Sequence, residues 1–308
     1  MNKPAMGFYS LLFLMAIVSA RAGDIPGLTG PYLGQKPPGM TPELFAPGII
    51  STCAQHGSAY FSPDGKEVYF SRMYPRPSVI MYMREENGRW TPPKVVAEGL
   101  TPGLAPDGRT VFFSTWELWR MFKTPAGWTL PEKLGPSINF QKRQDTPYAA
   151  ANRTLYFCSM FGDRNGIYRA EFTAGTYGKP ERLEYEISSK YADFSPCVAP
   201  DESYLVFASA RPGYGVIDLY VSFRNDNGSW TPPKNLGPTI NTRAKEAFPF
   251  VSFDGKYLFF MSNRVSELNR SLIADGPGNV YWVDAKVIER LKPGKPNPSE
   301  KGSPRDKQ

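Results

Sequence analysis

The chain has 308 residues, a net charge of +7 and a single histidine, His56. One histidine excludes metal sites built from several imidazoles, and we expect neither a metal nor a cofactor. Much of the positive charge falls near the C-terminus and no basic stripe crosses the body, so the composition does not favour nucleic-acid binding. Many aromatic residues, with 31 Pro and 28 Gly, predict short strands joined by tight turns.

The N-terminus predicts a secretory signal peptide over residues 1–22. Lys3 is followed by an apolar run, and Ala20-Arg21-Ala22 fits the small-x-small cleavage pattern. The alternative is a membrane anchor, but the run is shorter than the ~20 residues that span a bilayer. We therefore expect a soluble chain without a membrane span, secreted or periplasmic, that continues as an extended lead over 23–40.

One phrase recurs five times along the chain, and each copy reads as a hairpin. Pro-Asp-Gly lies between two β-forming runs, where proline presets φ, aspartate caps the turn and glycine accepts a positive φ. The third copy lacks the glycine, so Asn152 is predicted to take the left-handed position there. The five copies cover residues 61–71, 104–114, 150–157, 198–207 and 251–260.

A third strand and a proline-led edge strand follow each hairpin, except that the last unit lacks the edge strand. A matching phrase at 41–48 is predicted to supply it and to close a ring. The expected fold is all-β: a five-bladed β-propeller of four-stranded antiparallel blades over 41–291. Blade cores are expected near 55–96, 99–138, 144–184, 191–240 and 246–284 plus 41–51. Residues 292–308 are expected to form a disordered basic tail.

These phrases resemble the TolB-like, WD40-like propeller repeat of bacterial envelope and secreted proteins. The resemblance is carried by Ser62-Pro63-Asp64-Gly65-Lys66, by Asp218-Leu219-Tyr220 and by Gly228-Ser229-Trp230. It covers nearly all of the mature chain and is specific for fold but weak for function. The chain departs from TolB, which carries an extra N-terminal domain before its propeller, so we expect a stand-alone propeller, and we expect it to be a monomer.

Two rings of polar residues are candidate sites. Eight residues before each turn aspartate, the register gives a ring at the channel mouth: His56, Gln144, Asp193 and Glu246, with Asp145 beside Gln144. This ring is either a polar ligand site or a set of strand caps. Arg72, Arg211 and Arg264 follow second strands, where they either bind a carboxylate or sulfate, or pair with the acids.

The leading functional hypothesis is a non-catalytic binding propeller that recognises a protein, peptide or glycan of the cell envelope. The alternative is a glycosidase-like, carbohydrate-active enzyme that uses two of Asp145, Asp193 and Glu246 as acid and base. Pairing of each acid with an arginine or a backbone N–H would weigh against the enzyme. No G-x-S-x-G elbow supports a serine hydrolase.

The cysteine count is odd. Cys53, Cys158 and Cys197 allow one disulfide plus one thiol, or three buried thiols.

Overall fold

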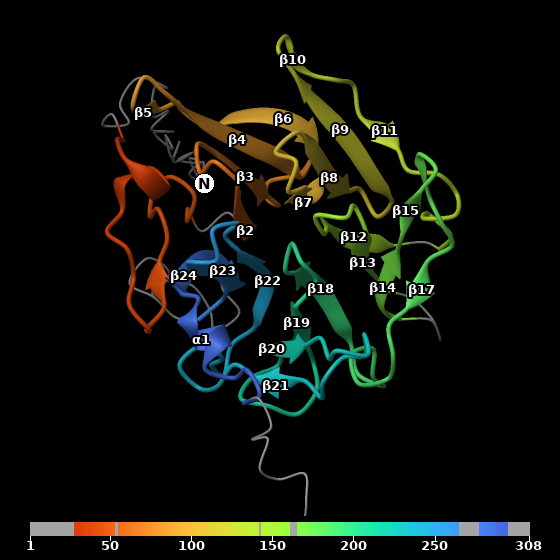
Figure 1. The fold of residues 1–308 in the computed structure, drawn as a ribbon. Coiled ribbons are helices and arrows are strands. Elements are labelled where there is room, and N and C mark those ends of the chain that lie inside the picture. The colour runs from red at the N-terminus through yellow and green to blue at the C-terminus, as the bar shows by residue number, and fades with distance from the viewer. Residues whose placement is uncertain (1–27, 53–54, 142, 161–164, 265–276, 295–308) are drawn as a thin grey trace, which may run out of the picture.

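The computed structural model describes residues 28–52, 55–141, 143–160, 165–264 and 277–294. Five antiparallel sheets surround one axis, so the chain is the predicted all-β, five-bladed propeller (Figure 1). The predicted signal peptide, Cys53 and the tail beyond residue 294 lie outside the described residues. Within the described residues, no helix is long and apolar enough to cross a membrane.

Each blade places its first strand at the axis and its last strand at the rim. Blade 1 consists of β2 (His56–Phe61), β3 (Glu67–Arg72), β4 (Val79–Glu86), β5 (Arg89–Trp90) and β6 (Lys94–Glu98). Blade 2 consists of β7 (Leu100–Leu104), β8 (Thr110–Ser114), β9 (Leu118–Thr124), β10 (Gly127–Trp128) and β11 (Glu132–Lys133). The short strands β5 and β10 extend the hairpins that start at β4 and β9.

The other three blades follow the same order. Blade 3 consists of β12 (Gln144–Ala149), β13 (Leu155–Ser159), β14 (Gly166–Ala170) and β17 (Glu181–Arg182), with the hairpin β15 (Phe172–Thr173) and β16 (Thr176–Tyr177). Blade 4 consists of β18 (Asp193–Val198), β19 (Tyr204–Ser209), β20 (Asp218–Phe223) and β21 (Lys234–Asn235). Blade 5 consists of β22 (Glu246–Val251), β23 (Tyr257–Ser262), β24 (Asn279–Asp284) and, from the N-terminus, β1 (Glu43–Leu44).

The ring closes as the repeat pattern predicts. Strand β1 pairs antiparallel with β24, with Glu43 opposite Trp282 and Leu44 opposite Tyr281. The next residue, Phe45, is fully buried among aromatic rings of blades 1 and 5. Closure therefore combines strand pairing with core packing.

Residues 23–40 were predicted to be extended, but the described part of this segment contains a helical turn. It forms a short 3-10 helix, η1 (Pro31–Gly34), and Tyr32 packs on Phe61, Tyr257 and Trp282 between blades 5 and 1. At the other end, α1 (Lys286–Glu289) follows β24 and buries Ile288. The described segments before β1 and after β24 thus pack against blade edges.

The hairpin turns follow the predicted chemistry with one correction. Gly65, Gly108 and Gly255 have φ of 69°, 66° and 72°. In the third copy Arg153, not Asn152, takes this left-handed position, with φ 70°. The reason is that Asn152 keeps the role of the aspartate, since its Oδ1 accepts a hydrogen bond from Thr154 N at 2.9 Å.

Candidate functional site

The propeller has two faces that differ in what they carry. On the turn face lie the hairpin turns between the first and second strands of each blade, such as residues 62–66. On the opposite, loop face lie the starts of the inner strands and the loops between second and third strands. Since the inner strands start at this face, His56, Gln144, Asp193 and Glu246 all belong to it.

The axis itself is filled by side chains. Each inner strand has a register shift, and in blades 2 to 5 a proline follows the shifted residue. The pairs are Thr101-Pro102, Thr146-Pro147, Ser195-Pro196 and Phe248-Pro249, which with Tyr60 and Tyr148 leave a cavity of about 10 Å³. This is roughly the space of one water molecule. The channel at this level does not admit a larger ligand.

Asp193 is held by an ion pair and three further hydrogen bonds. Its Oδ1 accepts from Arg211 Nη2 at 2.8 Å and from Ser209 Oγ at 2.6 Å. Its Oδ2 accepts from the N–H and the hydroxyl of Ser189, both at 2.7 Å. A carboxylate has about four lone-pair positions, so these contacts use them all.

Glu246 repeats this arrangement in blade 5. Its Oε1 accepts from Thr242 Oγ1 at 2.8 Å, from Ser262 Oγ at 2.7 Å and from Arg264 at 3.4 Å, and its Oε2 accepts from Thr242 N. The side chain is fully buried. Both acids therefore join the loop before an inner strand to the end of the second strand, which favours the strand-cap interpretation.

His56 is the blade 1 counterpart of these acids and is also buried. Its Nδ1 donates to the carbonyl of Ser71 at 3.2 Å, and its Nε2 accepts from Thr52 Oγ1 at 2.8 Å. Burial, opposed by the hydrogen bond to Ser71 and aided by the nearby Arg72 charge, lowers the pKa of His56 to about 4. His56 is a neutral strand cap in this geometry.

We expect the histidine resonance in the NMR spectrum to titrate near pH 4 in the folded chain and near ~6.5 in urea. Because the folded pKa is the lower one, the unfolded chain binds more protons between these values, so stability falls as pH drops from about 6.5 to about 4. The cost is about 3 kcal/mol. His56→Gln should lack this component, and a folded-state pKa near 6.5 would contradict the assignment.

The other predicted site residues, Arg72 and Asp145, have positions or contacts that differ from those of the capping residues Asp193 and Glu246. Arg72 lies opposite His56 within β3, so it aligns with Ser209 and Ser262 and not with Arg211 and Arg264. Asp145 accepts hydrogen bonds from Thr101 Oγ1 of blade 2 and from Thr146 N, and burial raises its pKa.

Gln144 is fully buried, and its amide makes no hydrogen bond to a described residue. Cys158 and Cys197 are buried thiols whose pKa burial raises to about 12.

The pattern in the sequence that marks the caps is a Ser or Thr four residues before the capped position. Thr52, Ser189 and Thr242 precede His56, Asp193 and Glu246 at this spacing. Blade 3 has Phe140 at that position, and there Ser159 Oγ bonds to Gln141 instead of Gln144. The cap motif thus explains which blades are tied in this way.

The loop face carries apolar side chains that sequence reasoning did not single out. Among the described residues, eight large hydrophobic side chains are exposed, and six belong to loops of this face. They are Tyr74, Trp116, Met160, Tyr185, Tyr214 and Val216, with exposed fractions from 37% to 72%. Arginines accompany two of them, with Arg143 at 4.4 Å above the Trp116 ring and Arg76 at 6.0 Å from that of Tyr74.

The class of protein is therefore a five-bladed β-propeller with a filled axis. No family model and no curated protein matches the sequence. Among solved structures, the chain is similar to TolB from Acinetobacter baumannii, with 15% identity and a TM-score of 0.47 over 74% of this chain and 54% of that chain. The chain thus spans about half the length of that TolB.

Two enzymes are also similar in structure. One is an α-L-arabinofuranosidase from Podospora anserina, with 12% identity and a TM-score of 0.50 over 80% of this chain and 93% of that chain. The other is a gluconolactonase from Xanthomonas campestris, with 11% identity and a TM-score of 0.52 over 83% and 97%. At such identities these neighbours bear on the fold alone and carry no function to this chain.

Proposed function

We propose that this chain is an exported, non-catalytic binding protein whose loop face docks a protein of the cell envelope. The observation that carries the proposal is the set of exposed aromatic and apolar side chains on the loops of one face. Trp, Tyr and Arg dominate the binding energy of protein interfaces, and Trp116 with Arg143 and Tyr74 with Arg76 present these residue types together.

The contacts of the buried acids support a binding role over a glycosidase role. Asp193 and Glu246 each pair with an arginine, and Asp145 accepts a backbone N–H. A general acid or base needs an oxygen within reach of the substrate. Since these oxygens point into blade contacts, the loop-face side chains are the groups available to a partner.

The experiment compares the mature chain with Trp116→Ala and Tyr214→Ala as bait in an envelope extract, followed by titration with the purified partner. We expect each substitution to weaken binding about tenfold or more, as hot-spot truncations do. Leu130→Ala is the matched control, because Leu130 is 90% exposed but belongs to the rim. Equal binding by all variants, binding of a glycan alone, or turnover of a glycan would each overturn the proposal.

A further inference from the structure

The five seams between neighbouring blades can be compared with one another on the turn face, since the blades share one register. At the seam of blades 5 and 1, Tyr32 packs in the groove and its hydroxyl donates to Asp254 at 3.3 Å. At the seam of blades 4 and 5, α1 packs nearby, where Lys234 Nζ donates to Leu291 O. Segments from the two ends of the chain therefore lie at two of the five seams.

Two other seams each contain a glutamate whose carboxylate is hydrogen-bonded and paired with a basic side chain. Between blades 1 and 2, Glu67 accepts hydrogen bonds from Tyr69 and Tyr82 and pairs with Lys123. Between blades 3 and 4, Glu202 accepts from Tyr156 and from Asn152, and it lies 3.6 Å from Arg224. In both seams a tryptophan, Trp128 or Trp230, packs nearby.

The seam of blades 2 and 3 has a basic residue where the seam of blades 3 and 4 has the glutamate. Arg153 occupies the turn position that Glu202 occupies in the next blade, and both take a left-handed φ. Phe112 stands in place of Tyr156, and Phe172 stands in place of Arg224. The Arg153 guanidinium stacks 3.6 Å above the Phe172 ring. No described residue forms an ion pair or hydrogen bond with that guanidinium.

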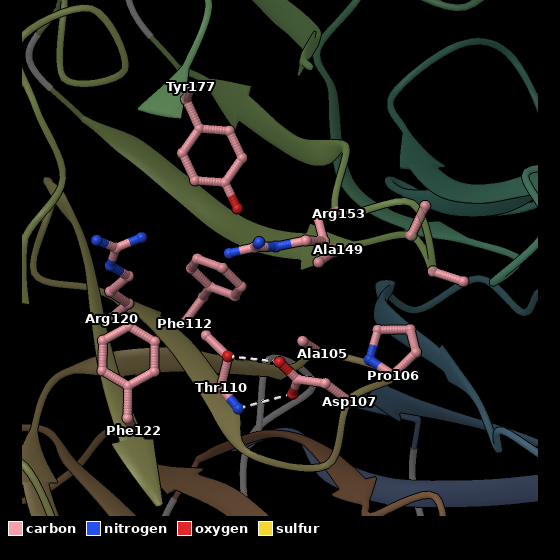
Figure 2. A pocket seen from close by; sticks show the side chains of 12 residues that line it. Ala105, Pro106, Asp107, Thr110, Phe112, Arg120, Phe122, Ala149, Arg153 and Tyr177 are labelled. Atoms are coloured by element: carbon pink, nitrogen blue, oxygen red, sulfur yellow. Dashed lines mark hydrogen bonds between the residues drawn. The ribbon is translucent and has the colours of Figure 1, made fainter. Parts of the chain in front are cut away.

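A small pocket results at this seam. Tyr177 replaces the tryptophan found in blades 1, 2 and 4, and the smaller ring leaves a cavity of about 40 Å³ beside Phe112 and Ala149. Figure 2 shows Arg153 extending over Phe112 and Arg120 standing on the other side of Phe112, with the Tyr177 hydroxyl pointing toward Arg153. Both guanidiniums lower the pKa of Tyr177 against the larger effect of burial, so their charges reach this hydroxyl.

The one acid in the pocket wall is committed to its own turn. Asp107 Oδ1 accepts from the N–H groups of Arg109 and Thr110, each at 2.8 Å, and Oδ2 accepts from Thr110 Oγ1 at 2.7 Å. The same aspartate occurs in the other turns, for example at Asp64 and Asp254. Against burial, these hydrogen bonds and the Arg153 charge lower the pKa of Asp107, so the two charges interact. No ion pair or hydrogen bond between described atoms joins Asp107 to Arg153, so Asp107 does not take the place that Glu202 has in the next seam.

We propose that this pocket binds a carboxylate that carries a small apolar or aromatic group. The carboxylate would take the place that the Glu202 side chain has in the next seam, with its oxygens on Arg153 and the Tyr177 hydroxyl. The apolar part would pack on Phe112, Ala105 and Ala149. A cavity of this size holds only a few heavy atoms, so the carboxylate and the first atoms of its apolar part would enter it, and a larger ring would extend beyond its opening. Both a free carboxylic acid and the C-terminus of a peptide offer this chemistry.

The test titrates the mature chain with benzoate, benzamide and a short peptide ending in phenylalanine, with a free or an amidated C-terminus. Backbone amide signals of residues 105–112 and 149–153 report binding. We expect saturable binding of benzoate and of the free-acid peptide, and binding at least about tenfold weaker for the two amides, as charge-assisted hydrogen bonds imply. Tighter binding of the peptide than of benzoate would identify a chain terminus as the source, and the reverse a free acid.

Two variants locate the site. Arg153→Gln removes the cation and should weaken benzoate binding between about tenfold and a hundredfold. Tyr177→Trp restores the residue of the other blades, fills the cavity and should abolish binding. Arg109→Gln is the matched control, because Arg109 belongs to the same turn face but lines the neighbouring groove with Lys123. Equal affinity for benzoate and benzamide, no saturable binding of either carboxylate, or unchanged binding by Tyr177→Trp would overturn the proposal.

Discussion

Arg211→Leu should lower the free energy of unfolding by about 3–5 kcal/mol, because it leaves the Asp193 carboxylate buried without its counter-ion. The Asp193 side chain has no exposed surface and that of Arg211 is 14% exposed, with 2.8 Å between Oδ1 and Nη2. The arginine also donates to the carbonyls of Glu186 and Ile187. Its removal therefore loosens the loop that leads into the inner strand of blade 4, and urea unfolding measures the loss.

The matched control is Arg169→Leu in blade 3. Arg169 pairs with Glu181 at 3.2 Å, but the two side chains are 26% and 69% exposed. Surface pairs of this kind contribute at most about 1 kcal/mol, so a small loss is expected. A double variant, Asp193→Asn with Arg211→Leu, should recover part of the stability because the buried charge is gone. If Arg211→Leu costs no more than Arg169→Leu, the ion pair is not the structural tie described above.

The fold could be predicted because the features that fix it are local and repeated. A turn with Asp or Asn between β-forming runs, such as Pro63-Asp64-Gly65, defines one hairpin, and five such hairpins define a ring. The missing strand of the last unit also has a local signature at Thr41-Pro42-Glu43-Leu44, and β1 forms there. The helical turn at Pro31–Gly34 could not be predicted, because Tyr32 is held by contacts with distant residues such as Tyr257. The third turn was predicted wrongly because Asn152 was aligned with the glycine of the other turns, whereas it takes the place of their aspartate.

The candidate site was only partly predictable for a physical reason. The position of Asp193 and Glu246 in the repeat predicts that both lie at the start of an inner strand. Whether such an acid faces a ligand or is bonded to another side chain of the blade depends on the neighbouring strands. Ser189 and Thr242, four residues earlier, are the visible signal of the cap. The significance of Arg153 emerges only from comparison with Glu202 across two seams, since a basic residue in an exposed turn is ordinarily unremarkable in a sequence.

The second large effect concerns the closure of the ring. Phe45→Ala should lower the free energy of unfolding by about 3–5 kcal/mol, as large-to-small changes of fully buried aromatic residues do. Phe45 has no exposed surface, and its ring centroid lies 5.1 Å from those of Phe259 and Trp282 and 5.8 Å from that of Phe61. Phe45 N also donates to Val280 O at 2.8 Å, so this residue joins both chain ends. Urea unfolding measures the loss.

Hydrogen exchange distinguishes loss of closure from general destabilisation. Because β1 is a two-residue strand, its hold on β24 depends on the Phe45 side chain, and loss of that side chain should unprotect the amide of Trp282, which faces β1, before those of blade 3. Leu130→Ala, at a side chain that is 90% exposed, should change stability by less than ~0.5 kcal/mol. Uniform loss of protection in all five blades would instead indicate that the ring opens only by global unfolding, with the β1 contact no weaker than the rest of the core.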